Sequence, residues 1–456
     1  MSAAGAQAPS TVNRRILRAA GAVTAASVVV KVVATVKEFT VAGVYGRIDA
    51  MDAFIAAAFI PGLLINLISE SMNQALVPTL VRVREQEGRA AARRLLSSSM
   101  LWMCLLLAAV SVVMGLFARV FFPLIAWNFS APKLDLAVRL FYGMLPIVLI
   151  TGIATTCTAV LNTAGRFAIP SLVPVLTPLC IIVSTMFLSS RLGIWALAYA
   201  TVIGAAIHAI WMILAMHCRG YPFSLRWHGM NAATKEIAQQ FGTVVLSSVV
   251  ASGGLLIDQI MAATLPAGSV SALAYAGRFV SVVLTLVGGA VSSAIIPVFS
   301  ELVAQRDWTV CRRTLRTWLL WTTMISIPIC GALIVGARIL VRLTFQHGVF
   351  GPGDTNAVAP VLALYALQIP FFVCSRVLYW FLLAMRRADL LFYCGLLNLV
   401  LDVVLNLVLV RWLGLAGIAL ATSLWTVSTL IFLWYWSWRV LVSCDPTAGT
   451  GFEGMR

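Results

Sequence analysis

Long apolar stretches separated by short polar segments dominate this chain. A helix needs about 20 residues to cross a membrane core of about 30 Å, and these stretches are that long or longer. The pattern predicts membrane-spanning helices at residues 19–45, 52–80, 95–122, 136–160, 169–190, 193–217, 240–264, 270–298, 317–344, 357–384, 389–410 and 413–438. We therefore expect an all-α integral membrane protein with about twelve transmembrane helices.

Two motifs recur in the second half of the chain, displaced by roughly 220 residues. Residues 73–102 are similar to residues 292–321, with Pro78 matching Pro297, and LGIWALAYAT from Leu192 matches LGLAGIALAT from Leu413. The basic loops and apolar spans keep their order in both halves. Such an offset predicts two parallel six-helix lobes, related by an axis along the membrane normal, around a central cavity.

The expected domain organisation follows from this repeat. It consists of a cytoplasmic N-terminal tail (1–15), an N-terminal lobe (16–217), a cytoplasmic linker (218–239), a C-terminal lobe (240–439) and a short cytoplasmic tail (440–456).

Composition and charge agree with a membrane protein. Hydrophobic residues make up 61% of the chain, charged residues 11%, and the mean hydropathy is +0.97, whereas soluble domains carry about 25% charged residues. The net charge of +16 is concentrated after even-numbered spans, for example at Arg93–Arg94 and Arg312–Arg313. Because cytoplasmic loops are enriched in Lys and Arg, we expect both termini in the cytoplasm. Contact with anionic lipid headgroups accounts for this charge, so we expect no nucleic-acid partner.

Motifs typical of enzymes are not found in a supporting context. The nine cysteines occur singly, most of them within apolar spans, and the four histidines are too scattered for metal-ligand spacing. Nucleotide-binding and hydrolase motifs are also not found where their chemistry could work. We therefore expect no enzymatic activity and no bound cofactor.

The first span carries a polar stripe that includes Lys31 and Glu38, with Lys37 about a third of a turn away. A Lys in the middle of a membrane costs about 2.5 to 3.5 kcal/mol, so it indicates a functional site. Two structural alternatives stay open. Lys31 could form a salt bridge with Glu38 or another acid, and Lys37 could extend its ammonium group to the membrane interface.

Polar groups within other spans are further candidates. Asp52, Asn66 and Glu70 lie on the second span, and Asp52 and Glu70, eighteen residues or five helical turns apart, should share a helix face. Arg278 lies near the outer end of a polar stripe on the eighth span. Cations from both lobes would suit an anionic substrate held between them.

Three segments, Asp52–Pro78, Leu265–Arg278 and Phe345–Thr355, make the chain similar to the MurJ/MviN lipid II flippases. These belong to the multidrug/oligosaccharidyl-lipid/polysaccharide exporter superfamily. The resemblance, which runs along almost the whole chain, implies a transporter of the bacterial cytoplasmic (inner) membrane. It would move an undecaprenyl-pyrophosphate-linked glycan to the outer leaflet, with cavity cations binding the pyrophosphate.

The resemblance assigns substrate contacts to Lys31, Lys37, Asp52, Glu70 and Arg278. We add Glu38 and Asn66 as candidates because of their places on the first two spans. The chain also departs from the family pattern. Ile65 and Asn66 stand where an Arg pair is common, Gly277 replaces an acid, and the sequence shows about twelve spans where the family usually has fourteen.

A second group of polar residues concerns energy coupling. Asn398, Asp402 and Asn406 are spaced by four residues along one face of the eleventh span, Asp258 lies within the seventh span, and Thr422 lies on the twelfth. Their oxygens suit a small hard cation, and the resemblance implies a sodium site here. Sodium or proton coupling would follow. The alternative is an ordinary interhelical hydrogen-bond network.

The function that we expect is therefore the flipping of a lipid II-like glycan by alternating access. Alternatives are an exporter of another lipid-linked oligosaccharide, such as an exopolysaccharide or O-antigen unit, a cation-coupled drug exporter, and a non-transporting membrane scaffold. Lys31 and Arg278 disfavour a drug pocket, and a scaffold has no use for buried charges. The expected partners are the lipid-linked glycan, membrane lipids and a cell-wall or polysaccharide polymerase.

Overall fold

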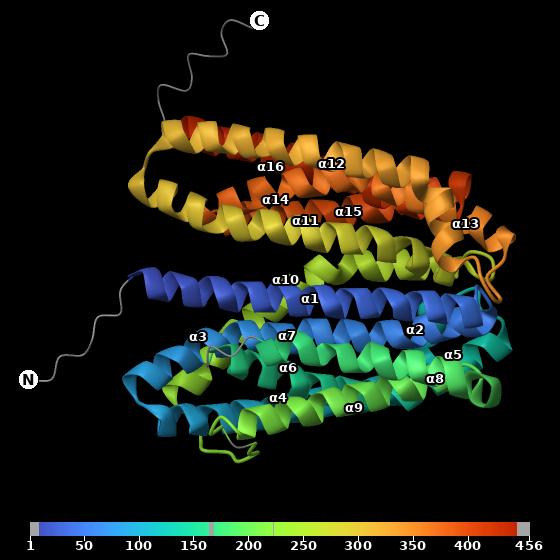
Figure 1. The fold of residues 1–456 in the computed structure, drawn as a ribbon, viewed down its shortest axis with the longest axis horizontal. Coiled ribbons are helices and arrows are strands. Elements are labelled where there is room, and N and C mark those ends of the chain that lie inside the picture. Colours follow the sequence, from blue (N-terminus) through green and yellow to red (C-terminus); the bar gives the residue numbers. More distant parts are fainter. Residues whose placement is uncertain (1–8, 164–167, 222, 445–456) are drawn as a thin grey trace, which may run out of the picture. The chain divides into compact units, whose positions relative to one another are not determined.

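The computed structural model describes residues 9–163, 168–221 and 223–444, and most of these residues are helical (Figure 1). In this part of the chain there is no β-strand, and ten helical segments are long and apolar enough to cross a membrane. The other two predicted spans, 19–45 and 240–264, coincide with helices α1 and α10, which are 37 and 32 residues long. The prediction of an all-α membrane protein is confirmed.

The described residues form two compact units. The first comprises the described residues of Met1–Tyr45, Ala53–Pro123 and Ser130–Ser248, and the second those of Gly46–Asp52, Leu124–Phe129 and Val249–Arg456. The division falls inside α10, and two short segments from the first half of the sequence belong to the second unit. The predicted tails 1–15 and 440–456 lie partly outside the described residues. The described helix α1 begins at Pro9, and α16 continues to Cys444.

The first unit contains most of the helices before α10. They are α1 (Pro9–Tyr45), α2 (Asp49–Leu64), a π-helical segment (Ile65–Glu70), α3 (Ser71–Gln86), α4 (Arg89–Ile125), α5 (Ala131–Met144), α6 (Pro146–Thr163), α7 (Ala168–Leu172), a 3-10 turn (Val173–Val175), α8 (Leu176–Leu192) and α9 (Trp195–His217). Helix α9 packs on α6 and α8, and α1 packs on α8. Buried Leu76, Met103, Leu107 and Met212 are part of the apolar core of this unit.

Helix α10 (Ala232–Ala263) leads into the second unit. Its other helices are α11 (Ser269–Gln305), α12 (Trp308–Phe345), α13 (Pro352–Ala366), α14 (Gln368–Ala384), α15 (Ala388–Leu413) and α16 (Leu415–Cys444). Helix α14 packs on α11, α12 and α16, and α15 packs on α16. The rings of Tyr275, Phe345 and Phe350 contact one another in the core, as do those of Phe299 and Phe381.

The second span is not α-helical throughout. Pro61 lies within α2, and residues 65–70 form π-helical turns before α3 continues. Each π turn takes in more of the chain than an α turn, and such segments are often found at functional sites. The expectation that Asp52 and Glu70 share a helix face assumed α-helical turns between them. The π-helical segment contradicts that assumption.

Two glycines at matching places in the proposed repeat have the same backbone conformation. Gly193 ends α8 with φ 54° and ψ −135°, and Gly414 ends α15 with φ 55° and ψ −129°. Each starts a tight turn into the next helix at a dihedral pair that favours glycine, because a Cβ atom is strained there. This agreement supports the repeat, whose superposition stays a prediction.

Replacing Gly414 by Ala should lower the free energy of unfolding by about 1 to 3 kcal/mol, because the backbone must hold an unfavourable φ. Thermal unfolding of the purified protein in detergent measures the effect. No neighbouring atom lies within 4 Å of the new Cβ atom, so the loss comes from the backbone alone. Gly193→Ala should behave in the same way.

Gly336→Ala is the matched control for this prediction. Gly336 lies within α12, has no neighbouring atom within 4 Å of an added Cβ and has no positive φ. Alanine is about 1 kcal/mol more favourable than glycine inside a helix, so stability should stay the same or rise. Equal stability of Gly414→Ala and Gly336→Ala would contradict the assigned role of the turn.

Candidate functional site

Two carboxylates lie close together in the interior of the second unit and share one donor. Asn406 Nδ2 on α15 lies 2.9 Å from Asp258 Oδ1 on α10 and 3.0 Å from Asp402 Oδ1. Thr422 Oγ1 on α16 lies 3.3 Å from Asp258 Oδ2. All four side chains are buried. The structure therefore brings together three of the four residues predicted as ligands of the ion site, and Asn406 of the same polar group joins them.

Two oxygens of this cluster have no hydrogen-bond partner among the described residues. They are the buried atoms Asp402 Oδ2 and Asn406 Oδ1. A Cβ atom at Gly254 of α10 would lie only 3.1 Å from Asp402 Oδ2, so the helix backbone approaches this oxygen closely. Tyr365 on α13 adds a hydroxyl group beside Thr422. Oxygen ligands of this kind suit a small hard cation.

The described residues contain no group of three or more His, Cys, Asp and Glu side chains arranged to hold a metal ion. A cation at this cluster would therefore depend on amide and hydroxyl oxygens in addition to the two carboxylates.

Asn398, the remaining predicted ligand, does not contact the cluster. Its Oδ1 accepts a hydrogen bond from Thr429 Oγ1 at 2.9 Å, and its Nδ2 lies 3.9 Å from Cys394 Sγ. Asn398 and Asn406 are each four residues from Asp402, on opposite sides. Spacing alone therefore could not decide which of them approaches Asp258.

The basic residues of α1 differ in their surroundings. The Lys37 ammonium forms an ion pair with Glu38, with Nζ 2.7 Å from Oε1, and both side chains are partly buried. Lys31 is exposed, and no carboxylate of the described residues pairs with it. Glu38 thus pairs with the neighbouring lysine, and Lys31 keeps a charge that is available to a ligand.

Asp52 has a structural position in the second unit. Its side chain is 1% exposed, and its Oδ2 and Oδ1 accept hydrogen bonds from the backbone N–H groups of Gly268 (2.7 Å) and Ser271 (2.8 Å). A carboxylate at the N-terminus of α11 satisfies free amides and the helix dipole. Arg47 supports the same loop, with Nε 2.9 Å from the Gly268 carbonyl oxygen and Nη1 3.4 Å from Asp354 Oδ1.

The remaining predicted substrate contacts lie on the second and eighth spans. Asn66 is exposed on the π-helical segment, and Arg278 is exposed on α11. The Glu70 side chain lies outside the described part of the structure. Direct contact of these residues with a substrate stays a prediction.

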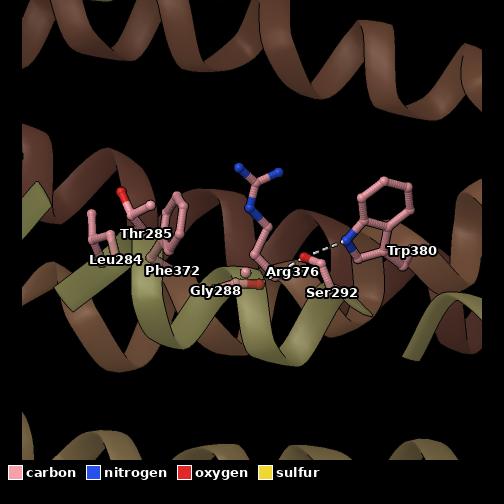
Figure 2. A pocket seen from close by; sticks show the side chains of 8 residues that line it. Leu284, Thr285, Gly288, Ser292, Phe372, Arg376 and Trp380 are labelled. Carbon is pink, nitrogen blue, oxygen red and sulfur yellow. Dashed lines mark hydrogen bonds between the residues drawn. The ribbon is translucent and has the colours of Figure 1, made fainter. Parts of the chain in front are cut away.

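Arg376 on α14 was missed by the sequence interpretation. It lines a cavity of about 320 Å³ between α11 and α14, together with residues of the polar stripe on the eighth span (Figure 2). The sequence signal was a single Arg within an apolar span, and it was overlooked among the aromatic residues of that span.

Comparisons with known proteins agree with the resemblance found in the sequence. A family model described as lipid II flippase MurJ matches residues 41–449. A protein of Synechocystis named "Probable lipid II flippase MurJ" is 26% identical over 440 residues, which cover 92% of this chain and 81% of the relative.

Solved structures show the same fold. A lipid II flippase MurJ in an inward closed conformation has a TM-score of 0.80 at 20% identity, covering 93% of this chain and 90% of that chain. An inward-facing multidrug resistance MATE family transporter has a TM-score of 0.78 at 13% identity, covering 91% and 96%.

Asn406→Ala should destabilise the protein more than Asn398→Ala does. The first change removes the donor shared by two buried carboxylates, which costs about 1 to 3 kcal/mol for each group left unpaired. The second removes one interhelical hydrogen bond, worth about 0.6 kcal/mol in membrane proteins. Thermal unfolding in the same detergent compares the two variants, and the reverse order would contradict the observed cluster.

Proposed function

This chain belongs to the lipid II flippase MurJ family, and we propose that its cargo is an undecaprenyl-pyrophosphate-linked glycan of the lipid II type. The family match over residues 41–449 carries this proposal. The protein is a multi-pass membrane transporter and not an enzyme. Its task is to lower the cost of moving a polar headgroup through hydrocarbon, where unpaired polar groups are highly unfavourable.

The basic residues within the spans suit such a cargo. Lys31 is exposed on α1 without a carboxylate partner among the described residues, and Arg278 is exposed on α11. A diphosphate accepts charge-assisted hydrogen bonds from ammonium and guanidinium groups, which are about twice as strong as neutral ones. We assign Lys31, Lys37 and Arg278 to the diphosphate, with transport by alternating access.

The orientation and the partners belong to the same proposal. Basic loops after the even-numbered spans favour cytoplasmic termini, so flipping would run from the inner to the outer leaflet of the bacterial cytoplasmic membrane. A cell-wall or polysaccharide polymerase would then use the glycan on the outer face.

Lys31→Ala should impair transport, and Lys31→Arg should retain it, because the diphosphate requires the charge. Loss of one charge-assisted contact of about 1.5 to 3 kcal/mol corresponds to roughly tenfold or more in affinity. Growth of a bacterial strain depleted of its own lipid II flippase measures the effect, with expression of each variant checked in membranes. If Lys31→Ala, Lys37→Ala and Arg278→Ala combined support normal growth, the assignment fails.

We further propose that the Asp258–Asp402 cluster binds a coupling cation, with sodium favoured. Two carboxylates that share a single donor in an apolar interior need a positive charge or protons nearby. The unpaired oxygens of Asp402 and Asn406 are suitable ligands. A cation that binds one transporter conformation more tightly shifts the equilibrium towards it.

Sodium chloride should raise the unfolding temperature of the wild-type protein relative to choline chloride at equal ionic strength. Ligands that bind the folded state stabilise it by mass action. Asp402→Asn should abolish this difference, because it removes one of the two negative charges. Asp389→Asn is the matched control, since Asp389 is exposed at the start of α15 and pairs with Arg387. A sodium effect that survives in Asp402→Asn would overturn the site.

A further inference from the structure

Arg376 lies on α14 (Gln368–Ala384), within the candidate membrane span Pro352–Ala384. An arginine within a span is unfavourable unless it faces protein or water. Its side chain is partly buried, and no carboxylate of the described residues forms an ion pair with it. The charge therefore has no counterion within the described part of the unit.

Aromatic rings hold the guanidinium in place. Its central carbon lies 4.9 Å from the ring centre of Phe372 and 5.8 Å from that of Tyr379. Cation–π contacts of this kind stabilise the charge but use none of the five N–H donors of an arginine. Figure 2 shows the guanidinium extending between Phe372 and Trp380. The group is oriented and still able to donate hydrogen bonds.

The opposite wall of the cavity is small and polar. Trp380 Nε1 donates to Ser292 Oγ at 2.7 Å, and Ser292 Oγ donates to the Gly288 carbonyl at 2.7 Å (Figure 2). Thr285 and Gly289 complete this side. A Cβ atom at Gly289 would meet no atom within 4 Å, so this glycine leaves open space along the cavity wall.

The cavity continues the polar stripe that begins at Arg278. Thr285 and Ser292 follow Arg278 at steps of seven residues and so lie on the same face of α11. Gly288 lies ten residues after Arg278, which is about 15 Å along the helix axis. The two arginines therefore mark separate positions along one face of the second unit.

We infer that the Arg376 cavity is a second oxyanion-binding position, which holds a phosphate or carboxylate group of the lipid-linked substrate away from Arg278. This inference rests on the proposed function. The guanidinium supplies a planar set of donors that matches such oxyanions. The rings of Phe372 and Tyr379 limit its movement, and the small residues of α11 leave room for the anion.

Binding measurements on the purified full-length protein in detergent test the inference. Arg376→Gln should weaken lipid II binding about tenfold or more, because a charge-assisted contact is lost. Arg376→Lys should show a smaller loss, since the charge remains without the planar fork. Gly289→Val should also weaken binding by filling the cavity, while Gly336→Val, on α12 with no neighbouring atom at its Cβ, should not.

One further probe, undecaprenyl diphosphate, identifies the anion. It carries no glycan or peptide, so a loss of its binding in Arg376→Gln identifies the phosphates as the ligand. If its binding is unchanged and lipid II, which carries peptide carboxylates, binds more weakly, the ligand is a carboxylate. Unchanged affinity of Arg376→Gln for both lipids overturns the inference.

A purely structural role of Arg376 predicts a different result. In that case Arg376→Gln would lower the unfolding temperature, while the folded variant would bind lipid II with wild-type affinity, and Gly289→Val would bind normally. If the proposed function itself is wrong, the result differs again, because the wild-type protein would then neither bind lipid II nor support growth of the depleted strain.

Discussion

The need to satisfy polar groups in a medium without water governs this structure. Backbone amides in hydrocarbon must be paired within the protein, which accounts for the all-helical architecture. The same requirement determines the hydrogen-bond partners of the buried polar side chains. Asp52 gives both carboxylate oxygens to free amides at the start of α11, and Asn406 donates to Asp258 and Asp402. Where a polar group finds no such partner among the described residues, as at the Arg376 guanidinium and Asp402 Oδ2, we propose a place for a ligand.

The sequence predicted the helices well because the apolar length required to cross a membrane is a strong and local signal. It predicted their interruptions poorly. The π-helical turns at Ile65–Glu70 contain no glycine or proline from which they could have been predicted. The break between α13 and α14 at Leu367 was likewise not predicted. Such details depend on packing against neighbouring helices, which a one-dimensional pattern does not contain.

The candidate sites show the same limit. Asp258, Asp402 and Thr422 were predicted, and they are brought together, because carboxylates within spans are rare and their family pattern is specific. The choice between Asn398 and Asn406 required the position of α10 relative to α15. Arg376 required the knowledge that glycines and a serine of α11 lie opposite it. The ion pair of Lys37 with Glu38 depends on rotamers, since adjacent residues on a helix usually diverge.

Asn406 uses both hydrogens of its amide, one for each carboxylate. The amide cannot rotate by half a turn without directing its oxygen at two acidic groups. The orientation of the Asn406 side-chain amide therefore depends on the charges of Asp258 and Asp402. A rotation of this amide would therefore link a change in charge at the two carboxylates to the packing of α10 against α15.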